Sequence, residues 1–272
     1  MVAEQDLKEI IRILLECSQG NVLSLADQKE IAEKFDCLLC DIEKIALEHS
    51  IVPARFTRNS LSCHEQLRLF QSRVAIIGCG GLGGRTAELL ARIGIGHLTL
   101  TDPDIFSESN LNRQIFCNAE TLGYNKVEVI SSELQKINPV LTTDIHINTF
   151  DAASVAEADI VIDGLDSATA RKDLVKLCQK QNIPIVHGAV KEWYGQIGVD
   201  RSANNLVCSL YPQATNSATA PNVMPMTVAL LAAMQAAEVC KFLLGKGSLI
   251  DEGWLQCDLL FSEYDHIKNT LC

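Results

Sequence analysis

Apolar runs alternate with helical patterns through the middle of the chain. Val74–Ile77 is continuously apolar, as in strands buried on both faces, and it precedes a helical pattern over Thr86–Ile93 and a second apolar strand over Leu98–Asp102. Later segments repeat the pattern: strands at Asp159–Ile162, Asn182–Val186 and Gly195–Val199, a helix over Val223–Leu244 with Gly245 as its C-cap, and one or two strands between Trp254 and Cys272. This alternation predicts an α/β fold with a doubly wound, mostly parallel sheet.

The first 53 residues carry helical patterns only. Their apolar positions recur at helical spacing in three runs: Leu7, Ile10, Ile11, Leu14 and Leu15; Ile31, Phe35, Leu38 and Leu39; and Ile42, Ile45 and Ala46. We therefore expect a small all-helical domain over residues 1–53 and an α/β domain over residues 54–272. Ser24–Asp27 is the expected N-cap region of the second helix, and Asp41 that of the third.

Charge limits the partners of the chain. The helical domain faintly resembles a helix-turn-helix, but acidic residues outnumber basic ones in it, whereas duplex binding depends on cationic contacts. We favour partner docking or dimer bracing for this domain. The net charge of −11 argues against nucleic acid or an anionic membrane as main partners. We find no stretch apolar and long enough for a membrane span and no signal-peptide core, so we expect a cytoplasmic protein.

A glycine turn follows the first central strand. Gly78, Gly80 and Gly83 stand at G-x-G-x-x-G spacing, with Gly81 among them. Glycines let the backbone approach a phosphate closely, and the helix N-terminus adds free N–H groups and partial positive charge. This Rossmann-like turn predicts nucleotide binding by these four glycines, with Asp102 on the ribose hydroxyls. Taken alone, it would suit a nicotinamide or flavin enzyme.

Polar residues beyond Asp102 favour a triphosphate over a dinucleotide. Ser109–Gln114 gathers amides and a guanidinium, Lys126 lies further along, and Asp163–Ser167 follows another apolar strand. Two cations balance phosphate charge, amides donate hydrogen bonds to phosphate or ribose oxygens, and a carboxylate at a strand end can hold Mg²⁺. A dinucleotide would not need a magnesium ligand.

Seven segments, in this order and spacing, give the chain a family resemblance. They are Arg55–Arg58, Gly78–Gly83, Asp102–Asp104, Asn110–Gln114, Gly123–Lys126, Ile137–Pro139 and Asp163–Asp166. Over roughly Arg55 to Leu260 the chain resembles the MoeB/ThiF/HesA family, the prokaryotic relatives of the ubiquitin-activating enzymes. The resemblance implies ATP-dependent adenylation of the C-terminal carboxylate of a small ubiquitin-like sulfur-carrier protein, typically ending in Gly-Gly, with release of pyrophosphate.

The resemblance also implies roles for single residues. Asp102 would bind the ATP ribose, Asp166 would hold Mg²⁺, and Arg58 would reach the triphosphate of the neighbouring subunit in a homodimer. Contacts to ribose and phosphates would come from Asn110, Arg113 and Lys126. Catalysis would consist mostly of aligning the carboxylate with the α-phosphate and spreading charge over the two arginines, Lys126 and Mg²⁺. No general base would be needed, since the attacking carboxylate is ionised at pH 7.

Two features of many family members are missing from this sequence. Many members hold a structural zinc through two Cys-x-x-Cys pairs, one after the middle of the chain and one at its end. Only Cys208 and Cys272 stand near the corresponding positions here, so we expect no zinc. Some members also form a thioester or acyl persulfide through a cysteine. Ala218 or Thr219 stands nearest to that place, and no cysteine lies between Cys208 and Cys240. We therefore expect the reaction to stop at the acyl-adenylate.

The other candidate groups favour structural roles. Eleven cysteines without a secretion signal indicate reduced thiols, and Cys37-Leu-Leu-Cys40 lacks the context of a redox or zinc site. Cys79, inside the glycine turn, would be reachable by thiol reagents if it lined the nucleotide site, although filling a small space is the favoured role. His187 either lines the groove for the partner's tail or is a structural residue at a strand end, and we favour the second.

Two alternative functions stay open beside adenylation. An NAD-dependent oxidoreductase would use the same glycine turn but would leave Arg58, Arg113, Lys126 and Asp166 without a shared purpose. A non-catalytic regulatory or binding protein on this fold would be expected to have lost at least one of them. The pathway is equally open among thiamin, molybdopterin or tungstopterin, amino-acid sulfur supply and peptide modification.

Overall fold

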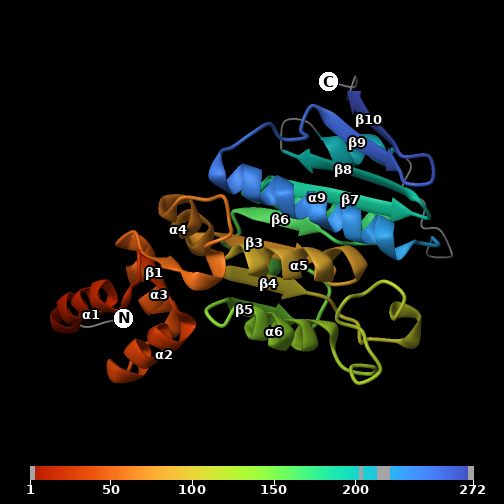
Figure 1. The fold of residues 1–272 in the computed structure, drawn as a ribbon. Coiled ribbons are helices and arrows are strands. Elements are labelled where there is room, and N and C mark those ends of the chain that lie inside the picture. The colour runs from red at the N-terminus through yellow and green to blue at the C-terminus, as the bar shows by residue number, and fades with distance from the viewer. Residues whose placement is uncertain (1–3, 202–204, 213–220, 269–272) are drawn as a thin grey trace.

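The computed structural model describes residues 4–201, 205–212 and 221–268, and one large twisted sheet forms the centre of the molecule (Figure 1). It has eight strands in the order β10-β9-β8-β7-β6-β3-β4-β5. The strands are β3 (Arg73–Ile77), β4 (His97–Thr101), β5 (Thr142–His146), β6 (Ile160–Asp163), β7 (Ile185–Lys191), β8 (Tyr194–Asp200), β9 (Gly253–Asp258) and β10 (Glu263–Lys268).

The order of the strands confirms the doubly wound fold. Strands β3 to β7 are mutually parallel, and β8, β9 and β10 continue the sheet in antiparallel pairs. From β3 the chain proceeds outward to β4 and β5, then crosses back to β6 and β7 on the other side. The direction of winding therefore reverses between β3 and β6, and a crevice opens at the carboxyl ends of strands at such a point.

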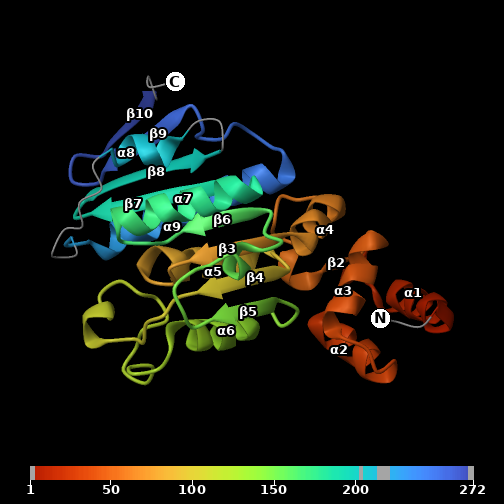
Figure 2. The same ribbon diagram turned by 180° about the vertical axis from the view of Figure 1, so that it is seen from behind.

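Helices cover both faces of this sheet (Figures 1 and 2). One face carries α5 (Gly81–Ile93), α6 (Lys126–Ile137) and α9 (Pro225–Leu244), and the other carries α7 (Ala168–Gln181) and the short α8 (Leu206–Leu210). Successive side chains of β3 point to opposite faces of the sheet and pack in two hydrophobic cores, Val74 and Ile76 in one and Ala75 and Ile77 in the other. Burial on both faces explains why this strand reads as an uninterrupted apolar run.

The N-terminal segment forms a body with a hydrophobic cluster of its own. It contains α1 (Glu4–Cys17), α2 (Leu25–Lys34) and α3 (Leu39–Glu48), so the three helices are confirmed. It is not purely helical, because β1 (Val22–Leu23) pairs in parallel with β2 (Val52–Pro53). In both ribbon views this body lies at the end of the sheet opposite the loop between β4 and α6. A 3₁₀ turn, η1 (Ala54–Phe56), and α4 (Cys63–Gln71) connect it to β3.

Two predicted helix starts need correction. Ser24 caps α2 as expected, accepting a hydrogen bond from the Asp27 backbone nitrogen at 3.1 Å. The third helix begins at Leu39 with Leu38 as N-cap. Asp41 therefore lies in the first turn, where the helix dipole still stabilises a carboxylate. Helix α5 begins at Gly81, five residues before Thr86, because the glycine turn itself winds into the helix. Two further 3₁₀ turns, η2 (Glu108–Asn110) and η3 (Ala153–Val155), lie in loops.

Helix α9 overturns the expectation that no segment would be apolar and long enough to cross a membrane. It is the one helix in the described ranges that passes on length and composition. Half of it is buried, and Thr86 of α5 donates a hydrogen bond to the Ala232 carbonyl on it at 3.4 Å. Core helices also meet these criteria of length and composition, and α9 packs as a core helix. Its C-cap is Gly245, in the left-handed conformation, as predicted.

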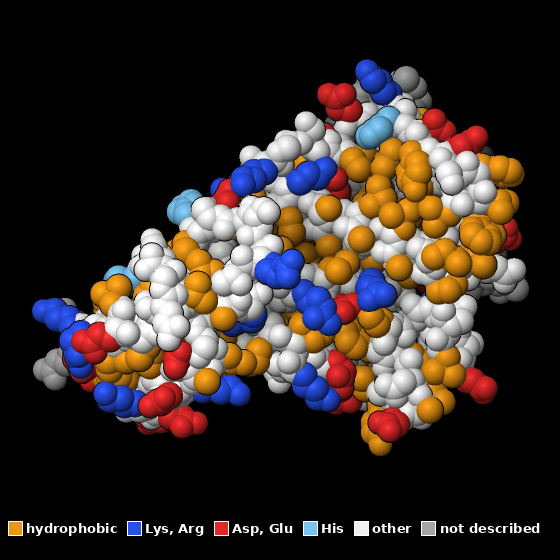
Figure 3. Space-filling model, in the orientation of Figure 1, with side chains coloured by type: hydrophobic (Ala, Val, Ile, Leu, Met, Phe, Trp, Pro, Cys, Tyr) orange, Lys and Arg blue, Asp and Glu red, His pale blue; other side chains and the backbone are white. Residues whose placement is uncertain are grey.

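The antiparallel end of the sheet carries exposed apolar side chains. Figure 3 shows hydrophobic atoms gathered on this face beside α9 and the antiparallel strands. Exposed large side chains on these elements and their turns are Tyr194, Met226, Leu260, Phe261 and Tyr264. The strands expected after Trp254 are present as β9 and β10, while the last four residues lie outside the described ranges.

Candidate nucleotide-binding site

A cavity of about 480 Å³ opens where the strand order reverses, at the carboxyl ends of β3, β4 and β6. Its lining includes residues from four separate segments: Gly78, Gly80 and Gly81; Asp102 and Asp104; Asn110, Arg113, Gln114 and Lys126; and Asp166 and Arg171. The structure thus brings together all the predicted site residues except Gly83 and Arg58. Open α/β sheets bind ligands at this place.

The glycine turn is shaped by close backbone contacts. Gly78 has φ +87°, and a Cβ on it would lie 2.7 Å from the Gly164 carbonyl oxygen. A Cβ on Gly83 would lie 1.9 Å from the Gly78 oxygen, so Gly83 serves the contact between α5 and the turn and does not line the cavity. Gly80 is the N-cap of α5. The first free N–H groups of that helix therefore face the cavity edge, where an anion is favoured.

Asp102 is fixed by backbone donors immediately after β4. Its carboxylate accepts hydrogen bonds from the Cys79 nitrogen at 2.7 Å and the Asp104 nitrogen at 2.9 Å, and only 5% of the residue is exposed. Burial raises the pKa of Asp102, and the ammonium of Lys126, 3.7 Å away, opposes that rise. Such a rigid acceptor at a strand end suits ribose hydroxyls.

Asp104 is a pocket residue that the sequence reasoning did not assign. Its carboxylate accepts a 2.8 Å hydrogen bond from the Lys126 Nζ atom. Lys126 is 6% exposed, so the two carboxylates hold the ammonium at the cavity wall. The signal was present in the Asp102-Pro-Asp motif, which places a second carboxylate two residues beyond the first.

The loop after β4 supplies the amides and the guanidinium. Asn110 accepts a hydrogen bond from the Ser107 nitrogen at 3.0 Å, and Arg113 donates to the Ser109 carbonyl at 2.9 Å. Gln114 is 6% exposed, and its Oε1 atom has no hydrogen-bond partner within the described residues. A buried amide without a partner on a cavity wall fits a polar ligand such as a nucleotide. Gln114 was in the motif but was not assigned a role.

The two carboxylates of the Asp163-Gly-Leu-Asp166 loop differ in their surroundings. Asp163 is buried and accepts hydrogen bonds from His187 Nδ1 at 2.8 Å and from the Leu165 nitrogen at 3.0 Å. Burial alone would raise its pKa, but Arg171 and His187 hold the pKa of Asp163 below its usual range. Asp166 is exposed, lines the cavity and bonds no other described residue. A free carboxylate of this kind fits a hard cation such as Mg²⁺.

His187 and Cys79 are structural. His187 is fully buried and absent from the cavity wall, and burial lowers its pKa, so it remains neutral beside Asp163. Cys79 is 1% exposed, and burial raises the pKa of its thiol far above the usual value. The thiol is therefore neither reachable nor ionised, which excludes ready attack by thiol reagents.

Arg58 lies away from the cavity of its own chain. It is exposed in the turn after η1. The segment before it is anchored to the helical body, because Arg55 Nη2 contacts the buried Glu43 carboxylate at 2.6 Å. Phe56 is buried, and a Cβ on Gly94 would lie 2.8 Å from its ring. The role of Arg58 toward a neighbouring subunit stays a prediction.

Some predicted positions fall outside the described ranges. Ala218, Thr219 and Cys272 are among them, while Cys208 lies partly buried in α8. In the ranges that are described, no three His, Cys, Asp or Glu side chains are clustered to hold a metal.

A family model and several known proteins match the sequence of this chain. A model of the ThiF family matches residues 54–271. The chain is 31% identical over 222 residues to a SAMP-activating enzyme E1 of Haloferax volcanii, covering 76% of this chain and 81% of that one. It is 32% identical over 212 residues to the molybdopterin-synthase adenylyltransferase of Escherichia coli K12, covering 75% and 85%.

Solved structures resemble the chain over nearly its whole length. The crystal structure of E. coli MccB with ATP has a TM-score of 0.66 at 21% identity, covering 98% of this chain and 89% of that one. This likeness establishes the fold, including its Rossmann-like sheet. It extends beyond the family match, which begins only at residue 54.

Proposed function

The chain belongs to the ThiF family, and from that premise we propose that it uses ATP to adenylate the C-terminal carboxylate of a small ubiquitin-like sulfur-carrier protein. The observation that carries the proposal is that one cavity is lined by the glycine turn, Asp102, Arg113, Lys126 and Asp166. Relatives named as adenylyltransferases and as a SAMP-activating E1 support this reaction.

The lining residues divide the work of binding ATP. Asp102, held by two backbone donors, accepts from the ribose hydroxyls, and the N-terminus of α5 faces the phosphates. Arg113 and Lys126 balance phosphate charge as pyrophosphate leaves. The incoming carboxylate is ionised at neutral pH, so positioning and charge stabilisation supply the catalysis without a general base.

Asp166 is the residue that would hold Mg²⁺ in this cavity. The ion would supply further positive charge to the phosphate oxygens when bound. Asp163 is unsuited to that role, because its carboxylate already accepts from His187 and the Leu165 nitrogen.

The arrangement favours adenylation over hydride transfer. A nicotinamide enzyme would use the glycine turn and Asp102 but would leave the two cations and the free Asp166 carboxylate without a function. A non-catalytic role is also disfavoured, because a protein without catalysis would be expected to have lost at least one of Arg58, Arg113, Lys126 and Asp166, and all four are present.

The exposed position of Arg58 fits a homodimer in which it reaches the partner's triphosphate. Mixing Arg58→Ala subunits with Asp166→Ala subunits tests this. Action in trans leaves one site of each heterodimer with neither defect, so partial activity returns. Action in cis leaves a defect at every site, and the mixture stays inactive.

The test of the proposed function is ATP–pyrophosphate exchange with purified protein, Mg²⁺ and each candidate carrier that ends in Gly-Gly. We expect exchange with one carrier, and loss of exchange when its terminal glycine is removed. Exchange that is absent with every carrier, despite tight ATP binding, would contradict the proposal.

A further inference from the structure

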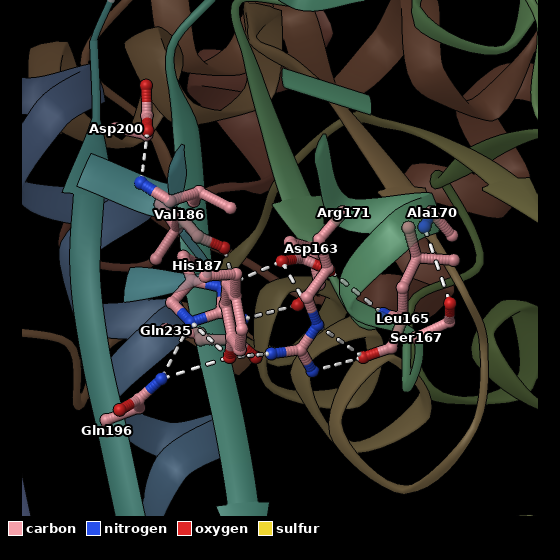
Figure 4. A network of polar contacts seen from close by, with 12 residues as sticks. Asp163, Leu165, Ser167, Ala170, Arg171, Val186, His187, Gln196, Asp200 and Gln235 are labelled. Atoms are coloured by element: carbon pink, nitrogen blue, oxygen red, sulfur yellow. Dashed lines mark hydrogen bonds and ion pairs between the residues drawn. The ribbon is translucent and has the colours of Figure 1, made fainter. Parts of the chain in front are cut away.

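We infer that Arg171 and Tyr211 are positioning residues that set the loop carrying Asp166, an assignment that rests on the proposed function of this site. Neither residue was singled out as functional from the sequence. Arg171 belongs to a polar network with Asp163 of β6, His187 of β7 and Gln196 of β8 (Figure 4). Tyr211 joins this network through hydrogen bonds from Arg171 and Gln196.

The network ties the backbone immediately before Asp166 from both sides. The Leu165 N–H donates to the Asp163 carboxylate at 3.0 Å. The Leu165 carbonyl accepts from the guanidinium of Arg171, from Nε at 3.1 Å and also from Nη2. With both backbone groups of Leu165 held, the two peptide units on either side of this residue are fixed, and so is the direction in which the chain enters Asp166. Because Asp166 itself bonds no other described residue, its carboxylate depends on this backbone for its position.

Arg171 donates hydrogen bonds to two other members of the network. It is 6% exposed and lines the cavity, but Nη1 donates to the Tyr211 hydroxyl at 2.5 Å while Nε and Nη2 serve Leu165. Asp163 lies 3.8 Å from Nε and balances its charge. The Arg171 guanidinium also lies over the Tyr211 ring, 5.4 Å from its centroid. Three of the five N–H groups of this guanidinium are thus donated to Leu165 and Tyr211, so the side chain holds the loop before Asp166.

The Tyr211 hydroxyl closes the network. It accepts from Arg171 Nη1 and from Gln196 Nε2, the latter at 3.0 Å, so its own hydrogen can point to His187 Nε2, which lies 3.4 Å from both the hydroxyl and Gln196 Nε2. His187 can accept there, because its Nδ1 hydrogen is donated to Asp163 and burial keeps the ring neutral. One hydroxyl thus connects the cation, the histidine and the carboxylate.

Other elements hold the network rigid. Gln235 of α9 donates from Nε2 to the carbonyls of Asp163 and Val186 at 3.0 and 3.2 Å. Tyr211 follows α8 directly, and Lys172 of α7 donates to the Pro212 carbonyl at 3.3 Å. The loop that carries Asp166 is therefore coupled to Tyr211 and Pro212, which follow α8.

The test measures ATP affinity by calorimetry with saturating Mg²⁺ and again in EDTA, for the wild-type protein and for Tyr211→Phe. Removing one hydroxyl should reduce the gain in ATP affinity that Mg²⁺ confers by roughly three- to tenfold, because a hydrogen bond to a charged group is lost. Affinity in EDTA should stay within about twofold of wild type. Tyr264→Phe, on the exposed strand β10, is the matched control and should leave both affinities unchanged.

Arg171→Lys is the second variant and keeps the charge without the planar fork. It should show the same selective loss, with thermal unfolding confirming that each variant is folded at the assay temperature. The inference would be overturned if Mg²⁺ raised the ATP affinity of either folded variant as much as it raises that of the wild type. It would also be overturned if a variant lost equal ATP affinity with Mg²⁺ and in EDTA. A wild-type protein that gains no ATP affinity from Mg²⁺ would instead contradict the metal role of Asp166, and hence the proposed function.

Discussion

The contact between Gly83 and Gly78 makes the sharpest structural prediction. A Cβ on Gly83 would stand 1.9 Å from the Gly78 carbonyl oxygen, 1.1 Å inside the 3.0 Å that real Cβ contacts respect (3.0 − 1.9), and 3.0 Å from Ile76 Cγ2. The obstacle is backbone, which cannot turn aside as a side chain can. Gly83→Ala therefore forces α5 and the glycine turn apart by about an ångström.

The expected cost follows from that displacement. Overpacking a tight core costs about 1–3 kcal/mol, and we expect the upper end here, measured as the free energy of unfolding in urea. ATP affinity should fall by at least about tenfold, because the displaced turn no longer presents its N–H groups to the phosphates.

Gly84→Ala on the same helix is the matched control. Its Cβ would lie 3.5 Å from the Cys79 oxygen and 3.7 Å from Ile130 Cδ1, which are ordinary contacts. In a helix interior alanine is more favourable than glycine by about 1 kcal/mol, so the stability of this variant should equal or exceed that of the wild type. Equal stabilities for the two alanine variants would refute the steric reasoning.

Three further predictions concern single carboxylates. Asp166→Asn should abolish Mg²⁺-dependent pyrophosphate release while changing the free energy of unfolding by less than about 0.5 kcal/mol, since the residue is exposed; retained release would remove it from the mechanism. Glu43→Ala should destabilise the protein in urea by roughly 3 kcal/mol, because Arg55 loses a partner that is 1% exposed, whereas Glu48→Ala, which breaks an exposed pair, should cost under about 0.5 kcal/mol; similar costs would contradict this. Burial raises the pKa of Asp200 to about 6, so the folded protein binds this proton more tightly than the unfolded chain does. The free energy of unfolding should therefore fall by roughly 2–3 kcal/mol as pH rises from about 4 to 6, and Asp200→Asn should remove that slope; identical pH profiles would exclude Asp200 as the cause.

Much of the fold was accessible from the sequence because its central strands are buried on both faces. The apolar run of β3 and the glycines after it have one structural interpretation, and Gly245 ends α9 in the conformation that glycine favours. The start of α5 was misplaced because glycines are poor helix formers, yet here they wind into the first turn, where close packing requires them.

The site was predictable where motif residues line the cavity and unpredictable where side chains act at a distance. Asp102, Arg113, Lys126 and Asp166 all reach one cavity: the first three follow β4 along the chain, and Asp166 follows β6. Arg171, on α7, was not assigned a role from the sequence. Its partners Leu165 and Tyr211 lie 6 and 40 residues away, and only folding brings the second to it.

The most direct test of adenylation is the intact mass of the carrier after incubation with this protein, ATP and Mg²⁺, together with pyrophosphatase. The account predicts a carrier that gains the mass of AMP at its C-terminal carboxylate, with no such product from the Asp166→Asn enzyme or from a carrier lacking its last glycine. A carrier left unmodified by the wild-type enzyme, or modified equally by both enzymes, would contradict the central claim.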